Sequence, residues 1–281
     1  MRSVLAVFFA VVCIGKCAPS LVAQDEKIDG EQIQIRRALF LSVNDYEVKL
    51  RKSNEPLRLL PDALLRWNNP ISGVKDGVIC GWVGKDGRPA VMAQAFLTRR
   101  GELAHEFQSV ATEPLVATIG ESQFWQPASP GIDLKPLSVG THPSENKSLR
   151  MTQMRRIADQ FGGEVEFKLQ PEDSTTSTYS LRLLSQPVYR YGSESGEVVD
   201  GSVFALVQGT NPEAWIFIEA RRQQGAQSQW YYGIAPMTGY TVRVNGPNNL
   251  RWESINQQGT RGRKDLPYIF RIYAAQMDLK R

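Results

Sequence analysis

Histidine and cysteine, the side chains that most often bind metals or act as nucleophile and base, are scarce in this sequence. Its 281 residues contain two histidines and three cysteines. Beyond the N-terminal segment, no apolar run approaches the roughly 20 residues that a membrane-spanning helix needs. The sequence also lacks a glycine-rich phosphate loop, an HExxH motif and an EF-hand loop. We therefore predict no metal ion, no cofactor and no transmembrane span in the mature chain.

The charge is close to balanced. The chain has 33 basic and 29 acidic residues, a formal net charge of +4. Loss of Arg2 and Lys16 with a cleaved N-terminal segment would leave 31 against 29, a net charge of +2. So small an excess gives no electrostatic basis for nucleic-acid binding. With 42% hydrophobic residues, the composition is that of a globular chain and not of a disordered one.

The N-terminal segment predicts export. Arg2 precedes an unbroken apolar run of 11 residues from Val4 to Ile14, and small and polar residues continue to Ala23. This layout is typical of a secretory signal peptide, which we place at residues 1–23. We therefore expect an exported protein that is periplasmic or extracellular.

Removal of that segment also changes the cysteine count. Cys13 and Cys17 lie inside it, so Cys80 is the single cysteine of the expected mature chain. One cysteine excludes an intramolecular disulfide, even in an oxidising compartment. We expect Cys80 to be a buried residue of a strand.

The remaining chain repeats itself. Residues 57–60 and 181–184 both read Leu-Arg-Leu-Leu, and without a gap this offset of 124 gives 12 identities over residues 57–112. The alternative to a duplicated unit is chance similarity at this one offset. Repeats of this kind indicate a duplicated unit. We expect a first α+β repeat at 31–126, a Pro/Ser-rich connecting arm at 127–149, and a second α+β repeat with a C-terminal strand at 150–281.

Each repeat is expected to contain one helix and then strands. Met151, Met154, Ile157 and Phe161 are spaced for one helical face. Segments rich in Gly and Asn predict four hairpin turns, at 85–88, 99–102, 209–212 and 223–226. Two Asp-Gly pairs are expected to mark the start of each meander, at 76–77 and 200–201. The predicted class is α+β, a tandem duplication in which each repeat is one helix plus a 4–5-stranded antiparallel meander, packed with pseudo-two-fold symmetry.

Several strings also resemble a known family. LRLLSQPVYRY at 181–191, DGSVFALVQGTNPE at 200–213, LRWNNP at 65–70 and GRPA at 87–90 are similar to a family of exported planctomycete-type bacterial proteins. The resemblance covers most of the mature chain and rests on turn and core residues. It implies export and no particular activity.

Three residues are the candidates for catalysis, namely His105, Glu106 and Glu219. His105 and Glu106 are neighbours on a predicted strand, so their side chains face opposite sides and cannot chelate one metal together. His105 shares a face with Ser109, but the strained turn of a Gly-x-Ser-x-Gly nucleophile is missing. A polar strand edge is the alternative that we favour for His105.

Paired carboxylates leave a glycosidase-like option. The pairs are Glu106 with Glu113 in the first repeat, and Glu213 with Glu219 in the second. The sequence does not determine the distance between the members of a pair. Solvated, salt-bridging glutamates are the favoured alternative.

Aromatic residues of the second repeat are the candidates for binding. They are Tyr191, Trp215, Trp230 and Tyr232. Exposed Tyr and Trp suit contact with a protein or a carbohydrate. The favoured alternative is that these rings pack in the interface between the two repeats.

Six charged residues recur at the 124-residue offset, and we expect them to be structural. They are Arg58 and Arg182, Arg66 and Arg190, and Asp76 and Asp200. A buried or half-buried Arg–Asp pair in each repeat is the arrangement that we favour, with a pair of equivalent ligand sites as the alternative.

Taken together, these features favour an exported, non-enzymatic protein that acts in binding or assembly at the cell envelope. An envelope protein or a carbohydrate is the kind of partner that we expect. The alternative is a hydrolase, including a glycan-acting one, with a carboxylate-based site.

Overall fold

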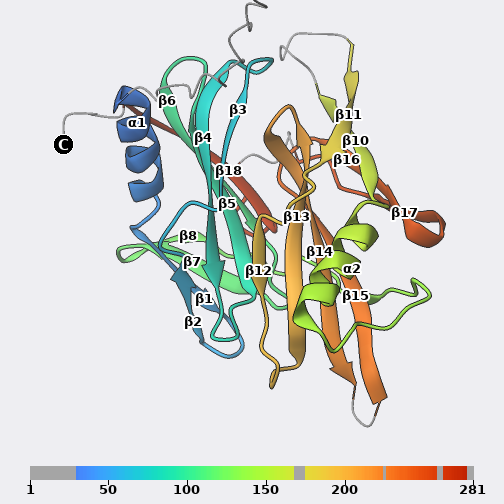
Figure 1. The fold of residues 1–281 in the computed structure, drawn as a ribbon. Helices are drawn as coiled ribbons and strands as arrows, with labels where there is room; N and C mark the ends of the chain where they lie inside the picture. Colours follow the sequence, from blue (N-terminus) through green and yellow to red (C-terminus); the bar gives the residue numbers. More distant parts are fainter. Residues whose placement is uncertain (1–29, 168–174, 224–225, 258–261, 277–281) are drawn as a thin grey trace, which may run out of the picture.

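A computed structural model describes residues 30–167, 175–223, 226–257 and 262–276 (Figure 1). The described residues are 52% strand and 11% helix, and their strands form two curled antiparallel sheets. The expected α+β class, with one helix and a meander in each repeat, is therefore wrong, and the class is β-rich. The predicted signal peptide, residues 1–23, lies outside the described residues.

The first sheet has nine strands. In the order of the sheet, β18, β6, β5, β4, β2, β1, β7 and β8 are neighbours, and β3 also pairs with β4. It is not a meander, because β7 returns to pair with β1. The strands are β1 (Tyr46–Leu50), β2 (Pro56–Leu59), β3 (Leu65–Asn69), β4 (Val74–Val83), β5 (Pro89–Leu97), β6 (Glu102–Ser109), β7 (Leu115–Ile119), β8 (Ser122–Trp125) and β18 (Tyr268–Gln276).

The second sheet also has nine strands, in the order β9, β15, β14, β13, β11, β10, β16 and β17, and β12 pairs with β13. The two orders match strand for strand. One edge strand of each sheet comes from a distant segment. In the first sheet, β18 from the C-terminal region pairs with β6. In the second sheet, β9 pairs with β15. The strands are β9 (Lys135–Pro136), β10 (Gly162–Phe167), β11 (Ser177–Leu183), β12 (Tyr189–Tyr191), β13 (Val198–Gln208), β14 (Asn211–Gln223), β15 (Ala226–Pro236), β16 (Thr241–Gly246) and β17 (Leu250–Glu253).

The helices lie on the outer faces of the paired sheets. Helix α1 (Gly30–Leu41) packs on β4 and β5, and helix α2 (Lys147–Ala158) packs on β13 and β14 (Figure 1). A short 3-10 helix, Pro247–Asn249, connects β16 and β17. Three apolar cores follow, one under each helix and one between the two sheets. The layers therefore run helix, sheet, sheet, helix.

Both faces of the central strands are buried in this arrangement. On β4, Cys80 and Trp82 lie in the core under α1, whereas Ile79 lies in the core between the sheets. This explains why β4 reads as an apolar run without polar alternation from Gly77 to Val83. Burial raises the pKa of the Cys80 thiol to about 12, so this cysteine is a packing residue.

The two Asp-Gly pairs do not mark the start of a meander. Gly77 lies within β4 opposite Trp67 of β3, and Gly201 lies within β13 opposite Tyr191 of β12. A Cβ atom at Gly77 would lie 2.3 Å from Cε2 of Trp67, and one at Gly201 would lie 2.6 Å from the Tyr191 ring. Glycine is needed at both positions because an aromatic ring lies directly on the backbone.

The gap-free alignment of the two halves is out of register after the first hairpin. In β4 and β5, Cys80 lies opposite Ala93, and in β13 and β14, Phe204 lies opposite Ile216. Cys80 and Phe204 are 124 residues apart, but Ala93 and Ile216 are 123 apart. A shift of one residue moves every side chain of a strand to the other face. The identities beyond residue 84 therefore do not join structurally equivalent positions.

Candidate functional site

A pocket between the two sheets is lined by several buried polar side chains, among them Gln94, Glu213 and Thr238. Strands β5 and β6 of the first sheet and β14 of the second turn one face toward each other there. Gln94 shares its face of β5 with Phe96, and Glu213 shares its face of β14 with Trp215. Glu106 projects from β6 on the same side, because the His105 face is directed to the core under α1.

The pocket has a volume of about 420 Å³, which lies within the range of small-ligand sites. Its walls are rich in aromatic rings, and polar groups are interspersed among them. The aromatic lining residues are Trp67, Phe96, Phe167, Tyr240, Tyr268 and Phe270. The polar lining residues are Asn69, Ser72, Gln94, Thr98, Arg99, Glu106, Asn211, Glu213 and Thr238.

Hydrogen bonds hold the two carboxyl groups of the pocket in place. The Tyr268 hydroxyl donates to Oε1 of Glu106 over 2.9 Å, and the amide of Gln94 donates to Oε2 of the same side chain. The Asn211 amide donates to Oε1 of Glu213 over 2.8 Å. Each carboxyl group is thus oriented by neighbours from its own sheet, including the edge strand β18.

The two carboxyl groups also affect each other. Burial raises the pKa of Glu213 to about 8, and the negative charge of Glu106 contributes to this rise, while hydrogen bonds from Thr238 and Asn211 oppose it. Glu213 is 4% exposed, so water offers little stabilisation to its ionised form. At neutral pH Glu213 therefore keeps its proton.

Two buried amide oxygens complete the polar surface of the pocket. Oε1 of Gln94 and Oδ1 of Asn211 have no hydrogen-bond partner among the described residues. Gln94 is 2% exposed, and a buried acceptor without a donor costs about 1–3 kcal/mol. The pocket therefore offers acceptors to a ligand that brings donors.

His105 lies outside this pocket. Its Nε2 lies 2.8 Å from Oγ of Ser42, and its Nδ1 lies 2.8 Å from the Tyr46 hydroxyl. The Ser42 hydroxyl itself donates to the carbonyl of Leu39, so it accepts from Nε2 of the histidine. Burial lowers the pKa of His105 to about 4, which keeps the ring neutral. The structure thus places His105 in a closed hydrogen-bond network under α1, and it separates His105 from Glu106.

Glu219 is also outside the pocket, and it joins the two sheets. It is fully buried, and its Oε1 accepts from Nε of Arg88 at 2.9 Å and from the Tyr191 hydroxyl at 2.6 Å. Nε of Arg221 lies 3.1 Å from its other oxygen. Arg88 belongs to the turn before β5, so this ion pair crosses from one sheet to the other. Glu219 is thus salt-bridged, but it is not solvated as the favoured alternative has it.

The aromatic candidates lie mostly in the cores. Tyr191 and Trp215 are buried between the sheets, and Trp230 is buried under α2. Tyr232 is half-buried against the α2 core. Three of these four rings are therefore not available to a partner at the surface.

One of the two expected Arg–Asp pairs is present. Asp200 binds Arg190 through Nε at 2.8 Å, and the buried Arg150 of α2 reaches the same carboxylate at 3.0 Å. In the first half, Asp76 instead binds Arg36 of α1 at 2.6 Å. The other arginines of the set are exposed, and they are Arg58, Arg66 and Arg182.

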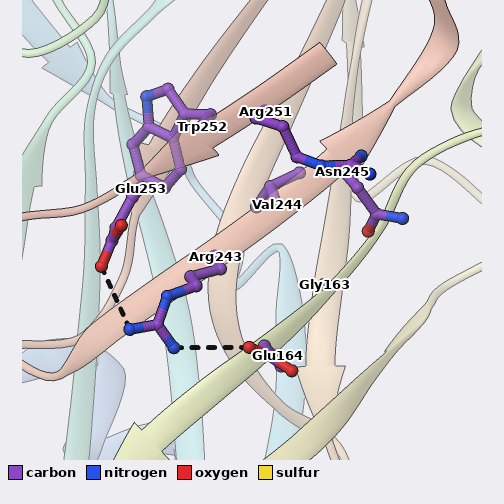
Figure 2. Close-up of a pocket in the computed structure, with 8 residues that line it drawn as sticks. All are labelled: Gly163, Glu164, Arg243, Val244, Asn245, Arg251, Trp252 and Glu253. Atoms are coloured by element: carbon purple, nitrogen blue, oxygen red, sulfur yellow. Dashed lines mark hydrogen bonds and ion pairs between the residues drawn. The ribbon is translucent and has the colours of Figure 1, made fainter. Parts of the chain in front are cut away.

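A second hollow, lined by residues of β10, β16 and β17, has a volume of about 490 Å³. Figure 2 shows Arg243 of β16 reaching Glu164 of β10 and Glu253 of β17. These ion pairs, 3.3 and 3.2 Å long, join partly exposed side chains, and such pairs contribute little free energy. The polar side chains of this hollow are thus paired mainly with one another.

Within the described ranges, no group of three or more His, Cys, Asp or Glu side chains is placed to hold a metal ion. In the same part of the chain, neither helix is long and apolar enough to cross a bilayer.

The sequence points to Glu106 as a candidate site residue, but it does not point to its hydrogen-bond partners Gln94 and Tyr268. Glu213 was considered only as a partner of Glu219 in its own repeat. A signal for Glu213 was present, because it alternates with Trp215 and Phe217 along an apolar strand face. No family model, curated protein or solved structure matches this chain.

Proposed function

We propose that this chain is an exported, non-enzymatic binding protein of the cell envelope, and that the pocket between the two sheets is its ligand site. The observation that carries this proposal is the combination, in one 420 Å³ pocket, of aromatic walls with buried, unpartnered acceptors. His105 and Glu219 support it indirectly. Both are fully engaged in hydrogen bonds or ion pairs away from this pocket.

The position of the pocket suits binding. Ligand sites commonly lie where two packed units meet, and they combine apolar walls with a few placed polar groups. Here the groups on one wall come from β5 and β6, and those on the other come from β14 and the turn after β15. A ligand in the pocket would contact both sheets and strengthen their packing, since any molecule that binds only the folded state stabilises it.

A screen with a pocket-blocking variant tests the proposal. The mature chain is screened against a library of small metabolites and sugars by ligand-observed NMR, in parallel with Ser72→Trp and Ser122→Trp. Ser72 is exposed at the pocket, whereas Ser122 is exposed at the start of β8 and does not line it. We expect hits that Ser72→Trp abolishes and Ser122→Trp retains. An absence of hits, or hits that Ser72→Trp leaves unchanged, rejects the proposed site.

The second candidate function is a glycan-acting hydrolase. It is favoured by one observation, a carboxyl group with a raised pKa next to a second carboxyl group, as in a general acid with its nucleophile or base. Turnover of an aryl-glycoside panel tests it. Activity that Glu213→Gln and Glu106→Gln each abolish, while Glu121→Gln retains it, would establish the hydrolase, and an inactive wild-type chain rejects it.

We also propose that the two halves descend from a tandem duplication, with boundaries near 31–126 and 150–281. The identical strand order of the two sheets supports this, as do the aromatic–glycine pairs Trp67–Gly77 and Tyr191–Gly201. Export is tested separately. Mass spectrometry of the chain secreted by a bacterial host should show an N-terminus near Gln24, and an intact Met1 would refute the signal peptide.

A further inference from the structure

The ionisable side chains inside the pocket are acidic. Glu106 and Glu213 lie within it, and Arg99, the one basic residue among its described lining residues, is exposed in the turn after β5. A negative ligand would have to enter beside these carboxyl groups, and burying like charges together costs free energy. Among the described lining residues the buried charge is therefore acidic, which disfavours an anion and favours a cation.

The hydrogen-bond balance points the same way. The donors of Gln94 and Asn211 are directed to the carboxyl groups of Glu106 and Glu213, whereas the amide oxygens of both side chains lack partners among the described residues. Against these two acceptors stands one buried donor of a lining residue without a partner among the described residues, Nε1 of Trp67, so acceptors are in excess. A ligand satisfies them only if it carries N–H or O–H donors, and a protonated amine carries two or three donors with no acceptor.

The aromatic walls add a third, independent preference. Trp67 and Phe96 have ring centroids 5.3 Å apart, and Phe96 stacks on Phe270 at 6.4 Å. Ring faces attract a nearby cation, and they also provide apolar surface for a carbon skeleton. A bare metal ion would use only the carboxyl groups, whereas an organic cation uses the rings as well.

We infer that the ligand of this pocket is a protonated organic amine with an apolar body, held by its ammonium group between Glu106 and Glu213. Its body lies against Trp67, Phe96 and Phe270. The inference rests on the proposed binding function and names the ligand class for the same site. Neutral sugars and metal ions are the competing ligands that the test separates.

Amine binding is coupled to proton release. The free protein holds a proton on Glu213 at neutral pH, and a cation placed beside that carboxyl group favours its ionised form. Binding therefore releases up to one proton, and the affinity rises with pH from about 6 to 8 as this cost disappears. The other charged or titratable groups lining the pocket are Glu106, Arg99, Tyr240 and Tyr268. The ammonium group stays protonated throughout this range because its own pKa is near that of lysine.

Isothermal titration calorimetry of the mature chain tests the inference with three probes of similar size. The probes are phenethylammonium, its neutral analogue 2-phenylethanol, and methyl glucoside, each at pH 6, 7 and 8 in two buffers of different ionisation enthalpy. We expect phenethylammonium to bind at least tenfold more tightly than 2-phenylethanol at pH 8. We also expect proton release at pH 7, and weaker binding at pH 6 than at pH 8.

Variants assign the effect to the two carboxyl groups. Glu106→Gln should weaken phenethylammonium binding at every pH. Glu213→Gln should weaken it tenfold or more at pH 8 and much less at pH 6, where the wild-type carboxyl group is itself neutral. The exposed Glu121→Gln is the matched control and should bind as the wild type does. The comparison of phenethylammonium with 2-phenylethanol needs no variant, so it stands even if a substitution impairs folding.

The results that would overturn the inference are specific. The amine inference is rejected if phenethylammonium and 2-phenylethanol bind equally, or if methyl glucoside binds more tightly than either. If Ser72→Trp abolishes that binding, the proposed binding function stays intact. Binding of phenethylammonium that Ser72→Trp and Glu106→Gln do not affect places the amine elsewhere and also rejects it. If none of the three probes binds, the amine inference fails, and the library screen decides separately on the binding function.

Discussion

Replacement of Glu213 by glutamine tests whether the pocket carboxyl group takes up a proton when the chain folds. Its pKa is about 8 in the folded chain, against an ordinary value of 4.5. Between these values the folded state binds more protons than the unfolded state does. The free energy of unfolding therefore falls as pH rises through this window, and it loses nothing further from this group well above pH 8.

The size of the effect follows from the two pKa values. At about 1.4 kcal/mol per pH unit, Glu213 should lower the free energy of unfolding by about 2.5 kcal/mol between pH 5 and pH 7, and by about 3.5 kcal/mol between pH 5 and pH 8. Glutamine cannot ionise, and its oxygen can still accept from Asn211. Glu213→Gln should therefore be close to wild type at pH 5 and more stable by about 3.5 kcal/mol at pH 8.

Urea unfolding at pH 5, 6, 7 and 8, followed by tryptophan fluorescence and circular dichroism, measures this difference. If the free energy of unfolding falls with urea concentration at the same slope in both proteins, the same amount of surface is exposed on unfolding. Glu121→Gln removes an exposed carboxyl group and should keep the wild-type pH dependence. A Glu213→Gln variant that keeps the wild-type slope, or that is less stable than wild type at pH 8, would refute the reasoning.

Three further predictions concern the framework around the pocket. Gly201→Ala would place a Cβ atom 2.6 Å from the Tyr191 ring and should cost about 1–3 kcal/mol in urea unfolding, and an unchanged midpoint would contradict the packing described. Glu219→Gln leaves the buried Arg88 without its charge partner and should cost about 3–5 kcal/mol, with a loss below 1 kcal/mol as the contrary result. The pKa of His105 is lowered from 6.5 to about 4, so the folded state binds fewer protons there and stability falls as pH drops below 6.5. His105→Gln should remove about 3 kcal/mol of that acid-induced loss in thermal or urea unfolding at pH 6.5 and 4, and a variant as acid-sensitive as wild type would exclude this role.

Local features of the chain were predictable because local physics produces them. The hairpin turns predicted at 85–88, 99–102 and 209–212 lie between strands as expected, since glycine and asparagine supply the backbone conformations that tight turns require. The central residues of the turn predicted at 223–226 lie outside the described residues. The apolar stripe of Met154 and Ile157 lies on α2 and faces its core. The predicted α+β fold class was wrong. Short strands such as β7, β8 and β17 contain only four or five residues, so their side-chain alternation is too brief to indicate a strand.

The site was predictable only in part. Glu106 was identified as a carboxylate on the strand face opposite His105, which follows from alternation alone. Its partner Glu213 lies more than 100 residues away, and nothing in the local pattern joins them. The pairing arises because two apolar sheet faces pack against each other. The alignment of the halves was no guide, since the register changes by one residue between β4 and β5.

The sequence by itself determined several of the strands and turns, because side-chain alternation and turn chemistry act over a few residues. The tertiary structure decided what those faces meet. Packing of the sheets buries Glu213 near Glu106 in a pocket where water cannot stabilise both charges, and that burial gives the carboxyl group its raised pKa. The same packing places Glu219 on Arg88 of the other sheet. The function of a polar residue in this chain thus depends on contacts between the sheets, which no local sequence pattern specifies.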